Sequence, residues 1–160
     1  MLLSRERRTT RLSRYAVGTL ALLAALALVA AGVANLTTSP PDAQQASAYL
    51  SAGIAAQQHG RTDDAREDYR RALAHDPSNK LGYYYLASLE QQQGQDKLAE
   101  EDYRAVLYFD RNFVPALLNL GFTLQSLGRD DEARTEFAAA VRIDPSVAAR
   151  IPAALLPRKQ

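Results

Sequence analysis

The sequence predicts an all-α protein whose main part is an α-solenoid of three stacked helix hairpins. A turn residue, a small residue and an aromatic residue each recur at intervals of 34 positions. The recurring residues are Gly60, Gly94 and Gly128; Ala65, Ala99 and Ala133; and Tyr69, Tyr103 and Phe137. A period of this length indicates supersecondary units that bury their apolar faces against one another rather than around a single core. Apolar residues make up 47% of the chain, and many of them are alanines, which favour helix.

Composition and charge exclude several classes of function. The 160 residues contain no cysteine, so disulfides, thiolate metal sites and thiol nucleophiles are ruled out. Residues 1–14 hold five arginines and one glutamate, for a net charge of +4. Residues 46–147 hold 11 basic and 16 acidic side chains, for a net charge of −5. A nucleic-acid-binding domain needs a basic stripe on its folded part, so we expect no nucleic-acid partner.

The chain begins with the basic segment 1–14, which is followed by 22 residues without a charge, residues 15–36. About 20 apolar residues in a helix cross the hydrocarbon layer, so residues 15–36 predict a transmembrane signal-anchor helix. After Arg14 the next lysine or arginine is Arg61, and this asymmetry places the N-terminus in the cytoplasm and the repeats outside the cytoplasmic membrane. The alternative is a signal peptide cleaved near Ala34, which would leave a secreted or periplasmic product. The length of the apolar stretch favours the retained anchor.

Residues 37–45 (TTSPPDAQQ) are expected to form a polar linker, because Pro40 and Pro41 oppose helix continuation. The repeats follow as three units of helix, turn and helix, which are residues 46–79, 80–113 and 114–147. In the first unit Gly60 suits the left-handed residue that ends a helix. Thr62 is then expected to cap the second helix of that unit.

These units resemble the tetratricopeptide repeat family. The aromatic, leucine and glycine of its signature are matched by Tyr49, Ala52 and Gly53, by Tyr83, Leu86 and Ala87, and by Leu117, Leu120 and Gly121. Its later alanine, aromatic, alanine and proline are matched by Ala65, Tyr69, Ala72 and Pro77, and by Ala133, Phe137, Ala140 and Pro145. The middle unit departs from the pattern, with Arg111 in place of proline and Glu90 in place of an aromatic; Glu90 is expected to face solvent or the groove. The resemblance implies that the helices of a hairpin approach closely where Gly53 and Gly121 meet the repeated alanines.

The family usually closes its last unit with an extra helix, and residues 148–160 are predicted to supply a short capping helix and a tail. Ser146 is expected to cap a helix that runs through Ala149 or Arg150, before Pro152 interrupts it. An apolar strip runs along this stretch, made of Val147, Ile151, Leu155 and Leu156. We interpret the strip as a cap over the third unit. The alternative is a strip that binds a partner or a second copy of the chain.

In members of the family the first helices of the units line a concave groove that takes a peptide or a helix. The resemblance implies a groove lined by Leu50, Ile54, Gln57, Tyr84, Tyr85, Ser88, Gln91, Leu118, Asn119, Phe122 and Gln125. The three glutamines recur at the repeat period, and amides can both donate to and accept from a peptide backbone. Aromatic rings supply contact area at low entropy cost. We therefore hypothesise recognition of an extended, largely uncharged segment; the alternative is that the glutamines are helix formers on a solvated face.

One partner class of the family is excluded. Members that hold the C-terminal carboxylates of chaperones use lysine and asparagine in one unit, asparagine in the next, and lysine and arginine in the third. At the matching positions this chain has Leu50 and Ile54, then Tyr85, then Pro115 and Asn119. Without cations at these positions nothing clamps a carboxylate.

No catalytic residue, cofactor or metal site is predicted. The two histidines, His59 and His75, lie near predicted helix ends, where the helix dipole favours them. Acidic pairs such as Asp63 and Asp64 recur at the starts of second helices, and capping explains them better than acid–base catalysis. Neither a phosphate-binding glycine loop nor metal-ligand spacing is present in the sequence.

The sequence thus predicts a non-enzymatic scaffold or assembly factor that is anchored in a bacterial cytoplasmic membrane by residues 15–36. Its repeats would present the groove outside that membrane to a protein or peptide partner, whose identity fold resemblance does not give. One alternative is a cleaved, chaperone-like assembly factor. Another is a structural repeat protein that self-associates through its C-terminal end.

Overall fold

The computed structural model describes residues 41–156, which form helices joined by short loops. In this part of the chain six α-helices are followed by two short 3-10 helices. The α-helices are α2 (Pro41–Gln58), α3 (Thr62–His75), α4 (Lys80–Gln92), α5 (Asp96–Phe109), α6 (Val114–Ser126) and α7 (Asp130–Ile143), and the 3-10 helices are η1 (Pro145–Arg150) and η2 (Ala153–Leu155). The predicted basic segment and transmembrane helix lie outside the described residues. Within residues 41–156, no helix combines the length and apolar content that a membrane span requires.

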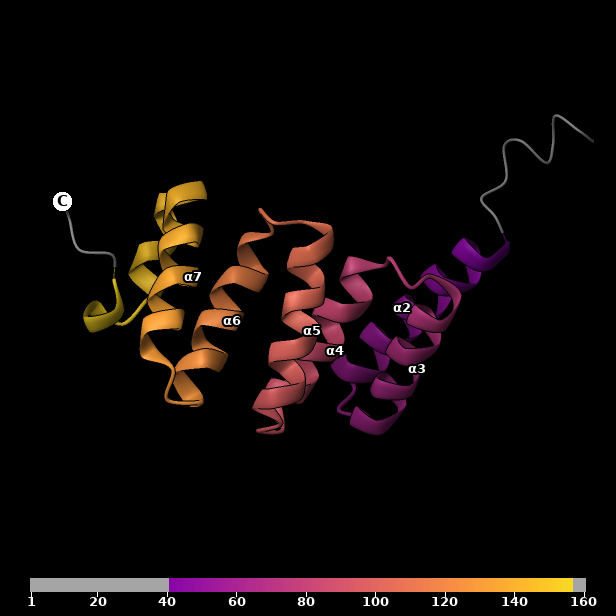
Figure 1. Ribbon diagram of the computed structural model, residues 1–160. Helices are drawn as coiled ribbons and strands as arrows, with labels where there is room; N and C mark the ends of the chain where they lie inside the picture. The colour runs from indigo at the N-terminus through magenta and orange to yellow at the C-terminus, as the bar shows by residue number, and fades with distance from the viewer. Residues whose placement is uncertain (1–40, 157–160) are drawn as a thin grey trace, which may run out of the picture. The chain divides into compact units, whose positions relative to one another are not determined.

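The helices form three antiparallel hairpins, α2–α3, α4–α5 and α6–α7, which stack in chain order (Figure 1). The second helix of one hairpin packs against the first helix of the next, as α3 does on α4 and α5 on α6. The first helices α4 and α6 also touch each other. These contacts confirm the predicted all-α solenoid of three hairpins.

The turns inside the hairpins depend on glycines in the left-handed conformation, as predicted. Gly60, Gly94 and Gly128 have φ values of 72°, 70° and 75°. The expected cap at Thr62 is wrong, because the turn is one residue shorter than predicted and α3 begins at Thr62 itself. The Arg61 backbone N–H donates to the Ala56 carbonyl at 2.9 Å, which closes the end of α2 in the manner of a Schellman motif. As a result Arg61 is the N-cap of α3 and Thr62 is already helical.

The first helix begins earlier than expected. Its first residue is Pro41, so residues 41–45 belong to α2 and not to the predicted linker. Proline opposes helix only where it follows other helical residues, because at the first position it has no intrahelical N–H bond to lose. The remainder of the predicted linker lies outside the described residues.

Each hairpin is filled by one aromatic ring from its second helix. Tyr69, Tyr103 and Phe137 are all fully buried. The closest approach at the glycines is to these rings; the expected alanine also lies near Gly53, where the Ala65 carbonyl would be 3.3 Å from an added Cβ. A Cβ added at Gly53 would lie 2.6 Å from Tyr69 Cε1, and one added at Gly121 would lie 2.5 Å from Phe137 Cε1.

The C-terminal segment closes the third hairpin, as predicted, but as 3-10 turns rather than as an α-helix. The N-terminal cap of η1 is the side chain of Asp144, which accepts from the Ser146 N–H, so Ser146 is not the capping residue. Val147, Ile151 and Leu155 are buried in one cluster with the core of the third hairpin, and Leu156 packs against that cluster. The apolar strip is thus occupied within the chain, which supports its interpretation as a cap.

The contact at Gly121 yields a prediction about stability. Gly121→Ala is expected to lower the free energy of unfolding by about 1–3 kcal/mol, because the new methyl group meets a ring that has no room to move. Gly82→Ala is the matched control. There a Cβ would meet Leu73 Cδ2 at 2.8 Å, the movable tip of a half-buried side chain. We expect the control to change stability by less than about 1 kcal/mol, since alanine also favours helix. Urea unfolding followed by circular dichroism measures both, and equal losses would contradict the prediction.

Candidate functional site

The surface formed by the first helices α2, α4 and α6, called here the first-helix face, holds the residues predicted to bind a partner. Ten of the eleven are partly exposed in the structure: Leu50, Ile54, Gln57, Tyr84, Tyr85, Ser88, Gln91, Asn119, Phe122 and Gln125. The exception is Leu118, which is fully buried in the hydrophobic core. Its assignment to a binding surface is therefore wrong. Its side chain packs in the core cluster that the second and third hairpins share, which encloses it completely.

Tyr84 is the most constrained aromatic side chain of this face. Its ring centroid lies 5.6 Å from that of Tyr85, 5.3 Å from that of Phe113 and 6.1 Å from that of Tyr103. The Tyr85 and Phe113 contacts are edge-to-face, the geometry that aromatic pairs prefer. Tyr84 therefore presents its exposed part from a fixed position.

Phe122 is held in the same way on the third unit. Its ring makes an edge-to-face contact with Phe137, with 5.0 Å between the centroids. Phe137 is itself fully buried between α6 and α7. The two aromatic residues that we expected to contact a partner, Tyr84 and Phe122, thus both pack against buried rings of the core.

The row of glutamines has an internal role that neither interpretation of the sequence included. The Tyr69 hydroxyl donates to Gln57 Oε1 at 2.6 Å, and the Tyr103 hydroxyl donates to Gln91 Oε1 at 3.0 Å. Burial raises the pKa of Tyr69 to about 12, so its hydroxyl keeps its proton and remains a donor. The third unit has Phe137 at the matching place and has no such bond to Gln125 among the described residues. The sequence could have indicated these hydrogen bonds, because each of the two glutamines precedes its tyrosine by the same 12 residues.

Asn119 extends this polar network from the second unit to the third. Its Nδ2 donates to the Tyr103 hydroxyl at 3.1 Å and to the Tyr84 hydroxyl at 3.4 Å. The backbone carbonyl of Asn119 accepts from the Thr123 hydroxyl at 2.9 Å. The network lies on the first-helix face and joins α4, α5 and α6, so it fixes the position of Tyr84 relative to α6.

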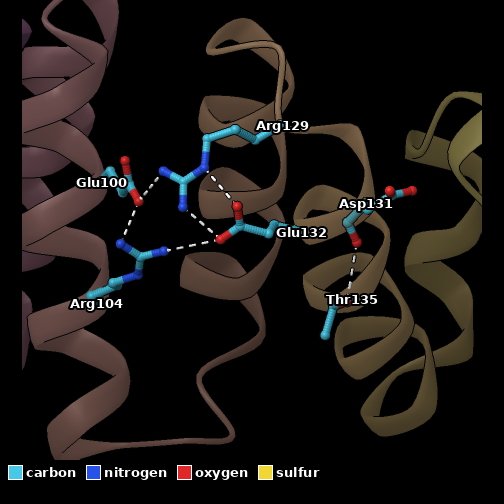
Figure 2. A network of polar contacts seen from close by, with 6 residues as sticks. All are labelled: Glu100, Arg104, Arg129, Asp131, Glu132 and Thr135. Atoms are coloured by element: carbon cyan, nitrogen blue, oxygen red, sulfur yellow. Dashed lines mark hydrogen bonds and ion pairs between the residues drawn. The ribbon is translucent and has the colours of Figure 1, made fainter.

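A second network fastens the same two units on the side of the second helices. Figure 2 shows Glu100 and Arg104 of α5 joined to Arg129 and Glu132 at the start of α7. Glu100 Oε1 accepts from Arg129 Nη1 at 2.6 Å and also pairs with Arg104. Arg129 donates to both oxygens of Glu132, at 2.7 and 2.5 Å, and holds the pKa of that carboxyl below its usual value. All four charges are engaged with one another, so this network is structural.

Glu90 is a buried carboxyl, not the solvent-facing or groove residue that we expected. It is 3% exposed, and its Oε2 has no hydrogen-bond partner among the described residues. Burial and the neighbouring Asp102 of α5 raise the pKa of Glu90 to about 7, while Arg70 and Arg66 of α3 oppose this shift. Burial also raises the pKa of Asp102 to about 6. The carboxyl pair therefore takes up a proton near neutral pH.

In the part of the chain that the structure describes, no three His, Asp or Glu side chains lie close enough together to hold a metal ion. His59 Nδ1 donates to the Ala55 carbonyl at 2.7 Å near the end of its own helix. His75 stacks on the Tyr49 ring with 5.5 Å between the centroids.

Two family models, both described as tetratricopeptide repeat, match residues 50–113 and 114–147. The chain belongs to the tetratricopeptide repeat family. This confirms the resemblance that the spacing of glycines, alanines and aromatics indicated, and repeats of this family are protein-interaction modules. No curated protein matches the chain.

Solved structures of the family share the fold of this tetratricopeptide repeat chain. The Arabidopsis OM64 TPR domain superposes with a TM-score of 0.63 at 24% identity, over 66% of this chain and 87% of that one. The first TPR of Spaghetti (RPAP3), bound to the HSP90 peptide SRMEEVD, gives 0.63 at 21% identity over 64% and 82% of the two chains. An O-GlcNAc transferase mutant from Thermobaculum terrenum gives 0.63 at 25% identity over 68% of this chain but only 21% of the enzyme.

The carboxyl pair predicts how stability depends on pH. Because Glu90 and Asp102 bind a proton more tightly in the folded protein than in the unfolded chain, their contribution is fully present below the usual pKa values and is lost as the pH rises through about 7. From about pH 5 to about pH 8 the free energy of unfolding should fall by roughly 1–3 kcal/mol more in the unmodified protein than in Glu90→Gln.

The control for this prediction is Glu100→Gln, which also neutralises a buried glutamate. It should destabilise the protein at the higher pH, because Arg104 and Arg129 lose the carboxylate that they share. Urea titrations at both pH values measure the two variants. Parallel pH curves for Glu90→Gln and the unmodified protein would show that Glu90 is ionised throughout.

Proposed function

We propose that this chain is a membrane-anchored scaffold whose first-helix face binds an extended, largely uncharged segment of a partner protein. The observation that carries the proposal is a face with fixed aromatic side chains and almost no available charge. On α2, α4 and α6 the charged residues are Asp42, Lys80 and Glu90. Glu90 is buried, and Lys80 is paired with Asp110 at 2.6 Å.

The chemistry of this face distinguishes the proposed partner from the peptide of one structural relative. The peptide bound by the first TPR of Spaghetti (RPAP3) ends in two glutamates, a valine and an aspartate. Such a ligand needs cations, because a carboxylate brought against an apolar surface loses its hydration. In this chain the matching positions hold Leu50, Ile54, Tyr85, Pro115 and Asn119. A neutral segment that offers backbone amides and apolar side chains fits this surface better.

The anchoring part of the proposal rests on the sequence. Residues 15–36 are long enough and apolar enough to span a bilayer, and the arginines before them favour an N-terminus in the cytoplasm. The repeats would then act outside the cytoplasmic membrane. A mature protein that begins near Asn35 would instead support the cleaved assembly factor, and mass spectrometry of the N-terminus distinguishes the two. Stacking through the C-terminal end is less favoured, because the apolar strip is already covered.

The partner-binding prediction concerns Tyr84 and Phe122. Tyr84→Ala combined with Phe122→Ala is expected to reduce partner recovery at least tenfold, since buried aromatic contacts often dominate binding energy. Recovery is measured by crosslinking in intact membranes followed by mass spectrometry. Leu98→Ala, at an exposed apolar residue of α5, is the control and should leave recovery unchanged. Unchanged recovery in the double variant, with circular dichroism showing normal folding, would remove the first-helix face from the proposal.

A further inference from the structure

The exposed apolar side chains of the solenoid gather at one edge. Because the hairpins are antiparallel, the starts of α2, α4 and α6 and the ends of α3, α5 and α7 share an edge, called here the inter-repeat edge (Figure 1). Of the large apolar residues that are exposed in the described part of the chain, four lie there: Tyr108 at 80% exposure, Phe109 at 43%, Ile143 at 39% and Leu81 at 38%. The fifth, Leu98, lies near the opposite edge, which carries the turns of the hairpins and is called here the turn edge.

The centre of this edge is a cluster of three aromatic residues. Tyr108 and Phe109 contact each other edge-to-face with 5.2 Å between the centroids, and Phe109 stacks on Tyr83 at 6.0 Å. Tyr108 is held at the end of α5 with its ring almost wholly in solvent. A ring with an apolar body and a polar tip is the kind of side chain that is enriched at the interface between a membrane and water.

The chain enters the solenoid at this same edge. Four residues, 37–40, lie between the uncharged segment 15–36 and Pro41, where α2 begins. The five steps from residue 36 to residue 41 span at most about 18 Å when fully extended. If residues 15–36 cross a bilayer, as the proposed function holds, the start of α2 is kept within that distance of the bilayer surface. The inter-repeat edge is then the part of the solenoid with the highest effective concentration at the lipid.

Three aspartates at this edge, Asp76, Asp110 and Asp144, have partners inside the protein. Asp110 pairs with Lys80, and Lys80 Nζ also lies 5.4 Å from the centre of the Phe113 ring. Asp76 and Asp144 accept hydrogen bonds from the backbone and hydroxyl groups of Ser78 and Ser146. These aspartates have partners inside the protein, so contact with the headgroups leaves none of them without a hydrogen bond.

We propose that the inter-repeat edge docks on the lipid bilayer, with the rings of Tyr108 and Phe109 at the boundary between headgroups and acyl chains. This inference rests on the proposed membrane anchor and adds an orientation to it. The row of hairpins would lie along the membrane surface, and the first-helix face would open sideways. A partner segment would then bind with its long axis parallel to the bilayer.

The absence of cysteine makes a site-specific test direct. Asn112→Cys places a single thiol in an exposed turn of the inter-repeat edge, and Gln95→Cys places one in an exposed turn of the turn edge. Each full-length variant is labelled with an environment-sensitive fluorophore and reconstituted into vesicles of phosphatidylcholine and phosphatidylglycerol. Flotation of the protein with the vesicles shows whether it is anchored in the bilayer. Quenching by spin-labelled phosphatidylcholine shows whether the probe contacts lipid.

Docking predicts blue-shifted, quenched emission from the probe at 112 and neither change from the probe at 95. Adding Tyr108→Ser and Phe109→Ser should abolish the quenching at 112, whereas the matched variant Leu98→Ser should not. Flotation with equal quenching of the two probes would overturn the docked edge and leave the anchor standing. A chain that does not float with the vesicles would overturn the anchor and the docking together.

Discussion

The contact on which the rest of the structure depends is the insertion of one aromatic ring between the two helices of each hairpin. Tyr69, Tyr103 and Phe137 are fully buried, and the ring in the first and third hairpins lies against a glycine of the facing helix. A side chain at that glycine would separate the helices. Because the ring recurs every 34 residues, each hairpin presents the same shape to its neighbour.

These rings also connect the core with the first-helix face. In the first two hairpins the buried residue is a tyrosine, and its hydroxyl reaches the amide of Gln57 or Gln91 on the facing helix. A buried hydroxyl needs such a partner, because an unpaired polar group in the interior is costly. The third hairpin has Phe137, which needs none. The period of the glutamines therefore follows, in the first two units, from the chemistry of the core.

The periodic features of the fold could be predicted because they are local. A glycine at Gly60, Gly94 or Gly128 determines a turn by its own backbone freedom, and the structure has all three in the left-handed conformation. The predictions that were wrong concern residues whose burial depends on tertiary packing. Leu118 stands in register with Leu50 and Tyr84, yet only Leu118 is completely enclosed. Glu90 was noticed as a departure from the pattern, but its burial beside Asp102 depends on how α4 and α5 pack.

The two networks between the second and third units bear on the proposal that the first-helix face binds a partner. Asn119 joins α4, α5 and α6 on that face, while Glu100 and Arg129 join α5 to α7 on the other side. A surface held on both sides loses little conformational entropy when a partner binds, so more of the contact energy appears as affinity. If the face binds a partner as proposed, the same rigidity would also make it selective. A segment with carboxylates would have to lose their hydration against Tyr84 and Phe122 without gaining a cation, and a fixed surface cannot rearrange to supply one.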